Sequence, residues 1–87
     1  MIDNTDKHRF ELTENGLIVS AEYRQHDDRY VITLVEADPA LRGSGAAGRL
    51  MEQIVAHARE KNLTLVPRCS YAMAWFKRHP ADNDVVG

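Results

Sequence analysis

The sequence has little of the features that assign a small protein to a special class. It holds one cysteine in 87 residues, so no disulfide can form within the chain. Its apolar runs are a few residues long, far short of the ~20 that cross a bilayer. Its 11 basic residues do not outnumber its 13 acidic ones, which leaves no positive field for nucleic acid or an anionic membrane. Because its N-terminus is polar and acidic, unlike a signal peptide, we expect a cytoplasmic protein with neither of those partners.

The composition itself is that of an ordinary globular protein. Hydrophobic residues make up 44% of the chain and charged residues 28%. A chain of this length buries roughly 60–65% of its unfolded surface, which is enough for one modest core. We therefore expect residues 1–87 to form a single domain.

The first half of the chain reads as three strands. Apolar and polar residues alternate over residues 8–13, 17–24 and 30–36, as they do in half-buried strands. Asn15 and Gly16 separate the first two runs, and Asn-Gly between alternating runs is a strong hairpin signal. A polar break at residues 25–28 marks a second turn. The pattern predicts an antiparallel three-stranded meander.

The second half changes to a helical period. Residues 46–61 carry an apolar stripe at i, i+4 and i+8, which predicts a long amphipathic helix. A short buried strand at residues 63–66 follows, and Ser70 is a candidate N-cap for a last helix over residues 70–77. Residues 82–87 read as a frayed tail. The fold class expected from this order is α+β, or mixed α/β, with a further strand and a C-terminal helix after the long helix.

The segment with chemical content is the glycine-rich turn before the long helix, Arg42-Gly43-Ser44-Gly45-Ala46-Ala47-Gly48. Small residues there allow several backbone N–H groups to converge on an anion at the positive end of the helix dipole. A phosphate or diphosphate is therefore the natural ligand. The P-loop pattern fails, because Arg49 and Leu50 stand where Lys and Ser or Thr are required.

Two weaker interpretations of the turn stay open. Gly43, Gly45 and Gly48 match the dinucleotide pattern G-x-G-x-x-G. That pattern should follow directly on a parallel strand, whereas residues 37–42 intervene here and the preceding strand belongs to a meander. The turn can also be a strand-to-helix connection without any ligand.

A third interpretation rests on a family resemblance. Arg42-x-x-Gly45-x-Ala47 resembles the acyl-CoA diphosphate motif of the GNAT N-acetyltransferase superfamily. Val66-Pro67-Arg68-Cys69 and the later run Ala74-Trp75-Phe76-Lys77-Arg78-His79-Pro80 resemble the ending of its minimal, YjdJ-type members. The resemblance covers most of the chain, from about Arg9 to Pro80.

The resemblance implies a truncated GNAT-like fold that binds acetyl-CoA. Pantetheine is expected in an opening between the strands at residues 30–37 and 63–66, and the diphosphate on the amides of the glycine-rich turn. The residues implied to bind the cofactor are Val35, Glu36, Ala37, Arg42, Gly43, Ser44, Gly45, Ala46, Ala47, Gly48, Cys69 and Lys77.

The resemblance also implies a reaction, in which a primary amine attacks the acetyl thioester. The acceptor is expected to be a small-molecule amine or a protein or peptide amine. Glu36 is implied as the proton acceptor, although it can equally be a solvated strand end. Cys69 is the second candidate catalytic residue, because it precedes a helix start, where N–H groups favour a thiolate. It can form an acyl-cysteine, contact the cofactor, or only pack.

Leu34 is a departure from the family pattern that keeps a second function class open. Leu34 stands where members of the group often carry a histidine, which favours a CoA-binding or interaction module without catalysis. The positive charge of Lys77 and its neighbours can serve a CoA phosphate or only the helix dipole. The histidines show no metal-ligand spacing, so no metal site is expected.

Overall fold

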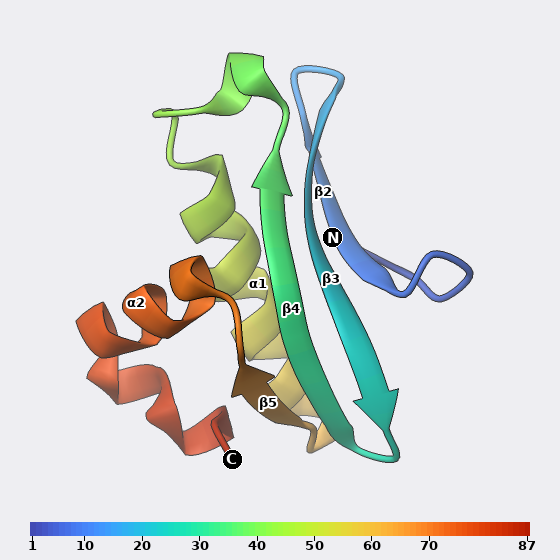
Figure 1. Cartoon of the computed structure of the whole chain (residues 1–87), viewed down its shortest axis with the longest axis vertical. Coiled ribbons are helices and arrows are strands. Elements are labelled where there is room, and N and C mark those ends of the chain that lie inside the picture. The colour runs from blue at the N-terminus through green and yellow to red at the C-terminus, as the bar shows by residue number, and fades with distance from the viewer.

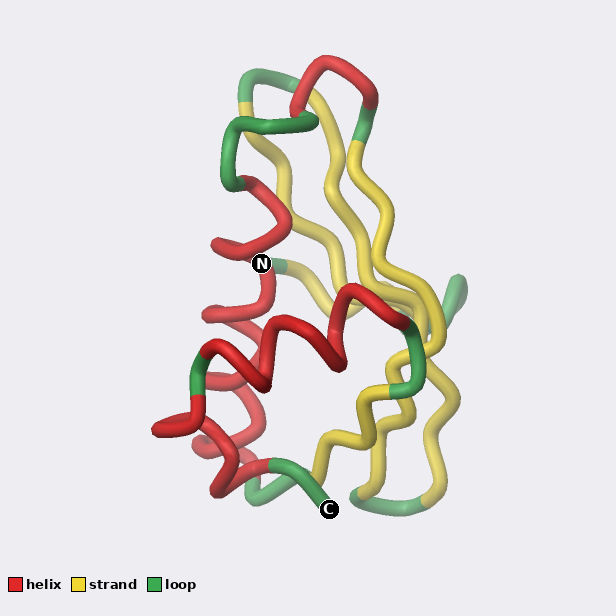
Figure 2. Tube along the Cα trace, turned by 60° about the vertical axis from the view of Figure 1, so that its left-hand side comes forward, coloured by secondary structure: helices red, strands yellow, loops and turns green.

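The computed structural model describes residues 1–87, in which five strands form one sheet in the order β1-β2-β3-β4-β5. The strands are β1 (Ile2–Asn4), β2 (Arg9–Glu14), β3 (Leu17–His26), β4 (Arg29–Ala37) and β5 (Thr64–Pro67). The helices are α1 (Ala46–Lys61), α2 (Ser70–Arg78) and the short 3-10 helices η1 (Pro39–Leu41) and η2 (Pro80–Val85). Helix α1 lies along the sheet, and α2 lies beside α1 (Figures 1 and 2). The chain has no helix that is both long and apolar enough to span a membrane.

The predicted meander is present. Strands β2, β3 and β4 pair antiparallel through two-residue turns. Asn15 and Gly16 have φ angles of 53° and 74°, the left-handed pair that a tight type I′ hairpin requires. Asp27 has a φ angle of 56° in the second turn. Asn and Asp tolerate this region better than other side chains, which explains the polar residues at both turns.

The strand and helix that follow the meander also match their predictions closely. Helix α1 spans the predicted residues, and Asn62 ends it in the left-handed conformation. Strand β5 lies one residue later than predicted and pairs parallel with β4. The long helix supplies the crossover that a parallel pair needs. The fold class expected from the sequence, an α+β domain with a meander, a long helix and a parallel strand, is therefore correct.

One buried cluster joins the helices to the sheet. It contains alternate residues of β2 and β3, the apolar stripe of α1, and Ala72, Trp75 and Phe76 of α2. Its fully buried side chains include Phe10, Val19, Ile32, Leu50, Met51, Ile54 and Leu65. Trp75 and Phe76 are 2% and 4% exposed, as expected for core residues of the last helix.

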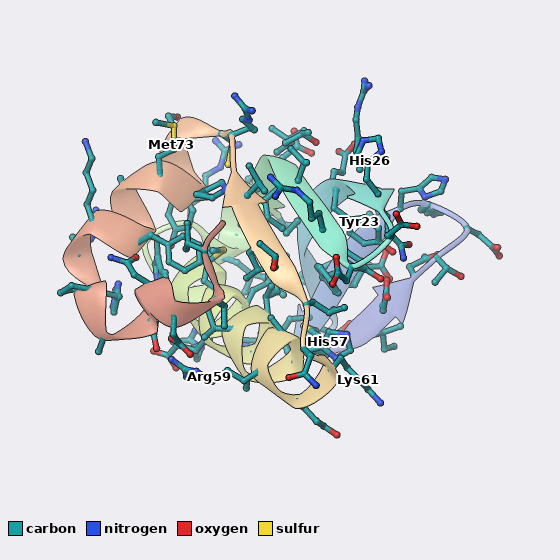
Figure 3. The ribbon with its side chains drawn as sticks, turned by 90° about the horizontal axis from the view of Figure 1, so that it is seen from below. Tyr23, His26, His57, Arg59, Lys61 and Met73 are labelled. Carbon is teal, nitrogen blue, oxygen red and sulfur yellow. The ribbon has the colours of Figure 1, made fainter.

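Two local predictions were wrong, and one strand was not predicted. The N-cap of α2 is Cys69 and not Ser70, because the Cys69 sulfur accepts the Ala72 N–H at 3.4 Å. The polar N-terminus adds a short strand, β1, whose three residues pair with β2. Residues 82–87 are not a frayed tail, because η2 buries Val85 against the core and Arg59 of α1 holds Asp82 and Asp84 (Figure 3).

Candidate functional site

Strand β4 has a free edge over its second half. Its pairing with β5 ends at Ile32 and Pro67, and the Arg68 and Cys69 N–H groups both donate to the Ile32 carbonyl. The pairing of β4 with β3 shifts register at the same level, so no residue of β3 lies directly opposite Thr33 in the ladder. The chain then leaves into α2, and residues 33–37 have no neighbouring strand on that side.

The ladder with β3 decides which groups face this free edge. The Asp38 N–H donates to the Ile18 carbonyl at 3.0 Å, so in this antiparallel pair the even-numbered residues of β4 after the shift bond to β3. The N–H and C=O groups of Val35 and Ala37 therefore point the other way, to the free edge. An extended ligand with alternating amide groups can bond there as a strand would.

The glycine-rich turn lies at the end of the same strand. The Ser44 hydroxyl accepts the Ala46 N–H, and the first α1 bond runs from Arg49 N–H to the Gly45 carbonyl. The remaining N–H groups of the turn donate to no protein acceptor, which leaves free donors at the positive end of a 16-residue helix. These free donors belong to Gly43, Gly45, Ala47 and Gly48.

Gly45 has a backbone conformation that other residues rarely adopt. Its φ angle is 87°, and a Cβ atom there would lie 3.0 Å from the Arg49 guanidinium. That guanidinium is itself held by Glu14, with hydrogen bonds of 2.7 and 2.8 Å, and lowers the pKa of this carboxyl group. The pair ties the first hairpin to the start of α1, which fixes the turn against the sheet.

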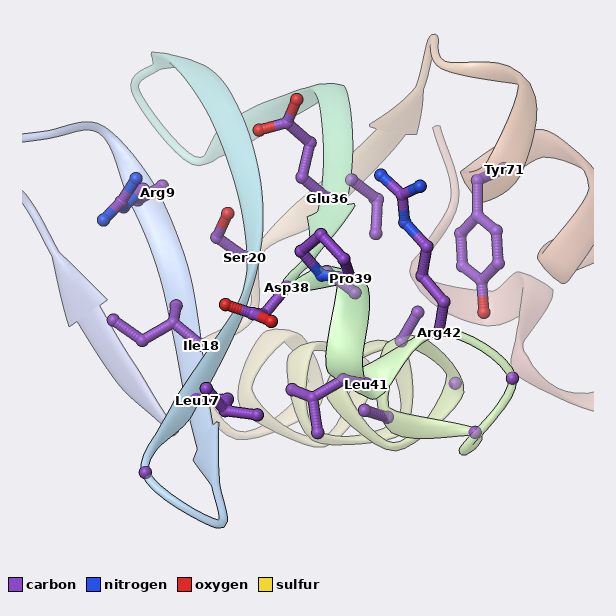
Figure 4. Close-up of a pocket in the computed structure, with 18 residues that line it drawn as sticks. Arg9, Leu17, Ile18, Ser20, Glu36, Asp38, Pro39, Leu41, Arg42 and Tyr71 are labelled. Carbon is purple, nitrogen blue, oxygen red and sulfur yellow. The ribbon is translucent and has the colours of Figure 1, made fainter.

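A pocket of about 940 Å³ joins the free edge of β4 to the turn (Figure 4). Most of the residues predicted to bind the cofactor line it. They are Val35, Glu36, Ala37, Arg42, Gly43, Gly45, Ala46, Ala47 and Gly48. Arg42 is exposed and forms no ion pair, so its charge is available to an anion. The fold thus brings together residues of β4, the turn and α1.

Three predicted residues do not line the pocket. Ser44 caps the turn internally, since its hydroxyl also donates to the Leu41 carbonyl at 2.5 Å. Cys69 is half-buried against the core and caps α2. Lys77 is exposed in the last turn of α2, away from the pocket lining. Its neighbour His79 stacks on Trp75 at 3.9 Å between ring centroids, a structural contact.

Tyr71 is a pocket residue that the sequence analysis did not single out. It lies in the first turn of α2, and its ring lies beside the Arg42 side chain (Figure 4). Its hydroxyl lies 3.8 Å from the position that a Cβ atom of Gly48 would take. Burial raises the pKa of Tyr71, so the phenol stays protonated at neutral pH. The sequence held one signal for this role of Tyr71. The residue lies in the first turn of α2, which starts where β5 leaves the edge of β4.

Comparison with known proteins assigns the family. The model for GCN5-related N-acetyltransferases matches residues 9–85, which is most of the chain. The chain belongs to the GCN5-related N-acetyltransferase (GNAT) family. Acetyl transfer is the general activity that this membership supports.

A solved structure shows that the fold is shared. The solution structure of a GCN5-like protein from Staphylococcus aureus superposes with a TM-score of 0.68. The match covers 92% of this GNAT chain and 89% of the other, at 22% sequence identity. The comparison with curated proteins gave no match.

Proposed function

We propose that the protein transfers the acetyl group of acetyl-CoA to a primary amine. The observation that supports this most directly is one pocket that joins the free edge of β4 to the free N–H groups at the start of α1. The free edge of β4 can pair with an amide-bearing arm, and the N–H groups at the start of α1 can bind a diphosphate. CoA carries both groups along one chain, and a dinucleotide lacks the amide-bearing arm.

The turn residues offer the groups that a diphosphate needs. The N–H groups of Gly43, Gly45, Ala47 and Gly48 need acceptors, and the helix dipole favours negative charge there. Arg42 adds a full positive charge at the rim. A side chain at Gly45 would intrude on this cradle, since that glycine is exposed toward the pocket.

The β4 residues fit the pantetheine arm and the acyl group. Acetyl-CoA supplies an acetyl group activated by its bond to sulfur. The Val35 N–H at the free edge donates a hydrogen bond to the carbonyl oxygen of that group and stabilises the charge that develops there. The Val35 and Ala37 side chains are half-buried toward the helices, so they form the floor of the opening.

Proton transfer then needs an acceptor and a donor on different sides of the acyl group. Glu36 is exposed, forms no ion pair and lines the pocket, so it takes the proton of the attacking amine directly or through water. Tyr71 lines the pocket from the other side and, like any phenol, is protonated at neutral pH, so it gives its proton to the departing sulfur. The new bond joins the amine nitrogen to the acetyl carbon, and the bond that breaks joins that carbon to sulfur.

We propose direct attack by the amine and not an acyl-cysteine. The Cys69 sulfur accepts a backbone N–H as a helix cap, and Cys69 does not line the pocket. Its role in the proposal is to start α2 and thereby to place Tyr71. Cys69→Ser keeps a capping oxygen and removes the thiol. Direct attack predicts turnover within a few-fold of wild type for this variant, whereas an acyl-cysteine route predicts none.

The second candidate is a CoA-binding module without catalysis. It is favoured by Leu34, which is 39% exposed beside the pocket where the family pattern often has a histidine. The two candidates share the cofactor site and differ only in turnover. The side chain of Leu34 can neither accept nor donate a proton, so our proposal assigns proton transfer to Glu36 and Tyr71.

The deciding experiment measures release of free CoA thiol from acetyl-CoA over a panel of amines and peptides. The proposal predicts turnover with at least one acceptor and a loss of about 100-fold or more in Glu36→Gln, the size typical of a general base. Binding of CoA by this variant should stay unchanged. If CoA binds and no acceptor is acetylated by the wild type, the module is the correct assignment.

A further inference from the structure

The exposed face of the sheet carries a row of three side chains that points away from the core. Ser20 of β3 lies opposite Glu11 of β2 and opposite Glu36 of β4. Their neighbours Phe10, Val19 and Ala21 are fully buried on the other face. Since successive side chains alternate, the row Glu11, Ser20 and Glu36 lies on the face that the helices do not cover.

Ser20 is the exceptional member of this row. It is the one polar residue among the 20 buried ones, at 6% exposed, and its hydroxyl makes no hydrogen bond. Every side-chain polar atom that is fully sealed from solvent has a hydrogen-bond partner in this structure. The Ser20 hydroxyl has no partner, so it must still be open to solvent. Ser20 lines the pocket, and its oxygen lies between Arg9 and Glu36 (Figure 4). An unpartnered hydroxyl that opens into a pocket is a ready hydrogen-bonding group for a ligand.

The charges around Ser20 favour a cation. Glu36 forms no ion pair, and Glu22 is unpaired in the next row of the same face. The one positive group on this part of the face, Arg9, already pairs with Glu11. An ammonium ion placed at Ser20 therefore meets an uncompensated carboxylate. A carboxylate placed there meets repulsion from Glu36, because Arg9 is already paired and the free cation of the pocket, Arg42, is assigned to the diphosphate of CoA.

Beside the hydroxyl lies an apolar surface. Ile18 is two residues along β3 on the same face, lines the same pocket and is 43% exposed. It can cover the carbon chain of a ligand whose charged end lies at Ser20 and Glu36. An alkyl chain can therefore lie along this side chain while its charged end reaches Ser20 and Glu36.

We propose that Ser20, Glu36 and Ile18 form the acceptor subsite, and that the acceptor is a primary ammonium group at the end of an alkyl chain. The Ser20 hydroxyl accepts a hydrogen bond from the ammonium group, Glu36 balances its charge, and Ile18 packs on its methylenes. This rests on the proposed function, and it deepens that proposal by naming the substrate class. Amino acids that carry a carboxylate next to the amine are excluded as good acceptors.

The test is an NMR titration of the ¹⁵N-labelled protein saturated with CoA, which requires no turnover. The probes are Nα-acetyl-lysine methylamide, cadaverine, Nα-acetyl-norleucine methylamide and alanine. The subsite predicts that the first two shift the amide signals of Ile18, Ser20 and Glu36. Norleucine has no ammonium group and alanine has a carboxylate, so neither should produce these shifts. Comparison of the lysine probe with cadaverine separates a polypeptide acceptor from a free diamine.

Ser20→Ala removes only the hydroxyl, and Thr13→Ala is its matched control. Thr13 is an exposed hydroxyl residue on the same face that does not line the pocket. A hydrogen bond to a charged group predicts roughly tenfold or more weaker binding of the lysine probe in Ser20→Ala. Thr13→Ala should bind as wild type. The spectrum of each variant reports directly whether it is folded.

The outcomes separate this inference from the proposed function. If CoA binds while the amine probes shift other residues or none, the acceptor subsite is wrong and CoA binding stands. Equal binding by Ser20→Ala and wild type also overturns the subsite, as does binding of the norleucine probe as tight as that of lysine. If CoA itself does not bind, the proposed function fails first.

Discussion

Glu36 and Tyr71 show how single residues acquire a role from their surroundings. Glu36 lies on the exposed face of β4 without an ion pair, and Tyr71 approaches the same pocket from α2. Burial raises the pKa of the phenol, so it is not ionised at neutral pH and can act only as a hydrogen-bond or proton donor to the departing sulfur. The two groups can therefore act as acceptor and donor without exchanging roles.

Tyr71→Phe tests the donor. The phenol proton is lost and the ring remains, so kcat should fall about 100-fold, the lower range for a general acid, with KM for acetyl-CoA little changed. Thiol release with an accepted amine measures both quantities. Tyr30→Phe is the control, because Tyr30 lies in the core and does not line the pocket. Equal kcat values for Tyr71→Phe and wild type would remove Tyr71 from the mechanism.

At the scale of elements, the start of α1 is held against the first hairpin by one ion pair. Arg49 lowers the pKa of Glu14 below its ordinary value of 4.5 by a hydrogen bond to the carboxylate. A lowered pKa in the folded state means that the unfolded state binds more protons in this range. The contribution of the pair to stability is thus present above about pH 5 and is lost as the pH falls through the folded pKa.

Glu14→Gln should make the melting temperature less dependent on pH. The wild-type protein should lose stability between about pH 5 and 3, since Glu11 and Asp84 also have lowered pKa values. In the variant this loss should be smaller, and the difference at pH 7 should be small because the pair is exposed. Thermal melts at several pH values measure it. A steeper loss in the variant would contradict the assignment of the Glu14 shift.

The C-terminal element is part of the core and not an appendage. Val85 is 6% exposed, Gly87 N–H donates to the Leu65 carbonyl, and Arg59 bonds to two carboxylates of η2. Because Val86 and Gly87 pair with Leu65 on the outer edge of β5, the element supports the strand whose early termination leaves β4 free.

Val85→Ala should therefore destabilise the whole domain. Removing two buried methyl groups costs about 2 kcal/mol by area bookkeeping, which is roughly 10 °C in melting temperature for a chain of this size. Ile2→Ala is the control, since Ile2 is 64% exposed and its truncation should cost little. A melt of Val85→Ala that overlays the wild type would show that η2 does not hold the core.

At the scale of the whole molecule, sequence patterns predicted most of the framework. The hairpins, α1 and the parallel strand follow from Asn-Gly chemistry and from clear periods of two and 3.6 residues. The short strand β1 and the segment η2 lack such periods. They form because tertiary partners, β2 in one case and Arg59 in the other, complete them.

The candidate site was predictable where it is made of backbone. The glycine-rich turn and the free edge of β4 depend on small residues and on the end of β5, both of which the sequence signals. Tyr71 and Ser20 depend on how α2 and β3 meet the pocket, which no local pattern encodes. Cys69 was one candidate for chemistry because it precedes a helix start, and in the structure its sulfur caps that helix.

The most direct test of the account is a thermal melt of the protein with CoA, with NADP as comparator. A ligand at about 100 times its Kd stabilises the folded state by about 2.7 kcal/mol, which should raise the melting temperature by roughly 10 °C or more. Gly45→Glu should abolish the shift and Arg42→Ala should reduce it, while Arg24→Ala, a cation outside this pocket, should not. No shift with CoA, or an equal shift with NADP, would contradict the assignment of this pocket to acyl-CoA.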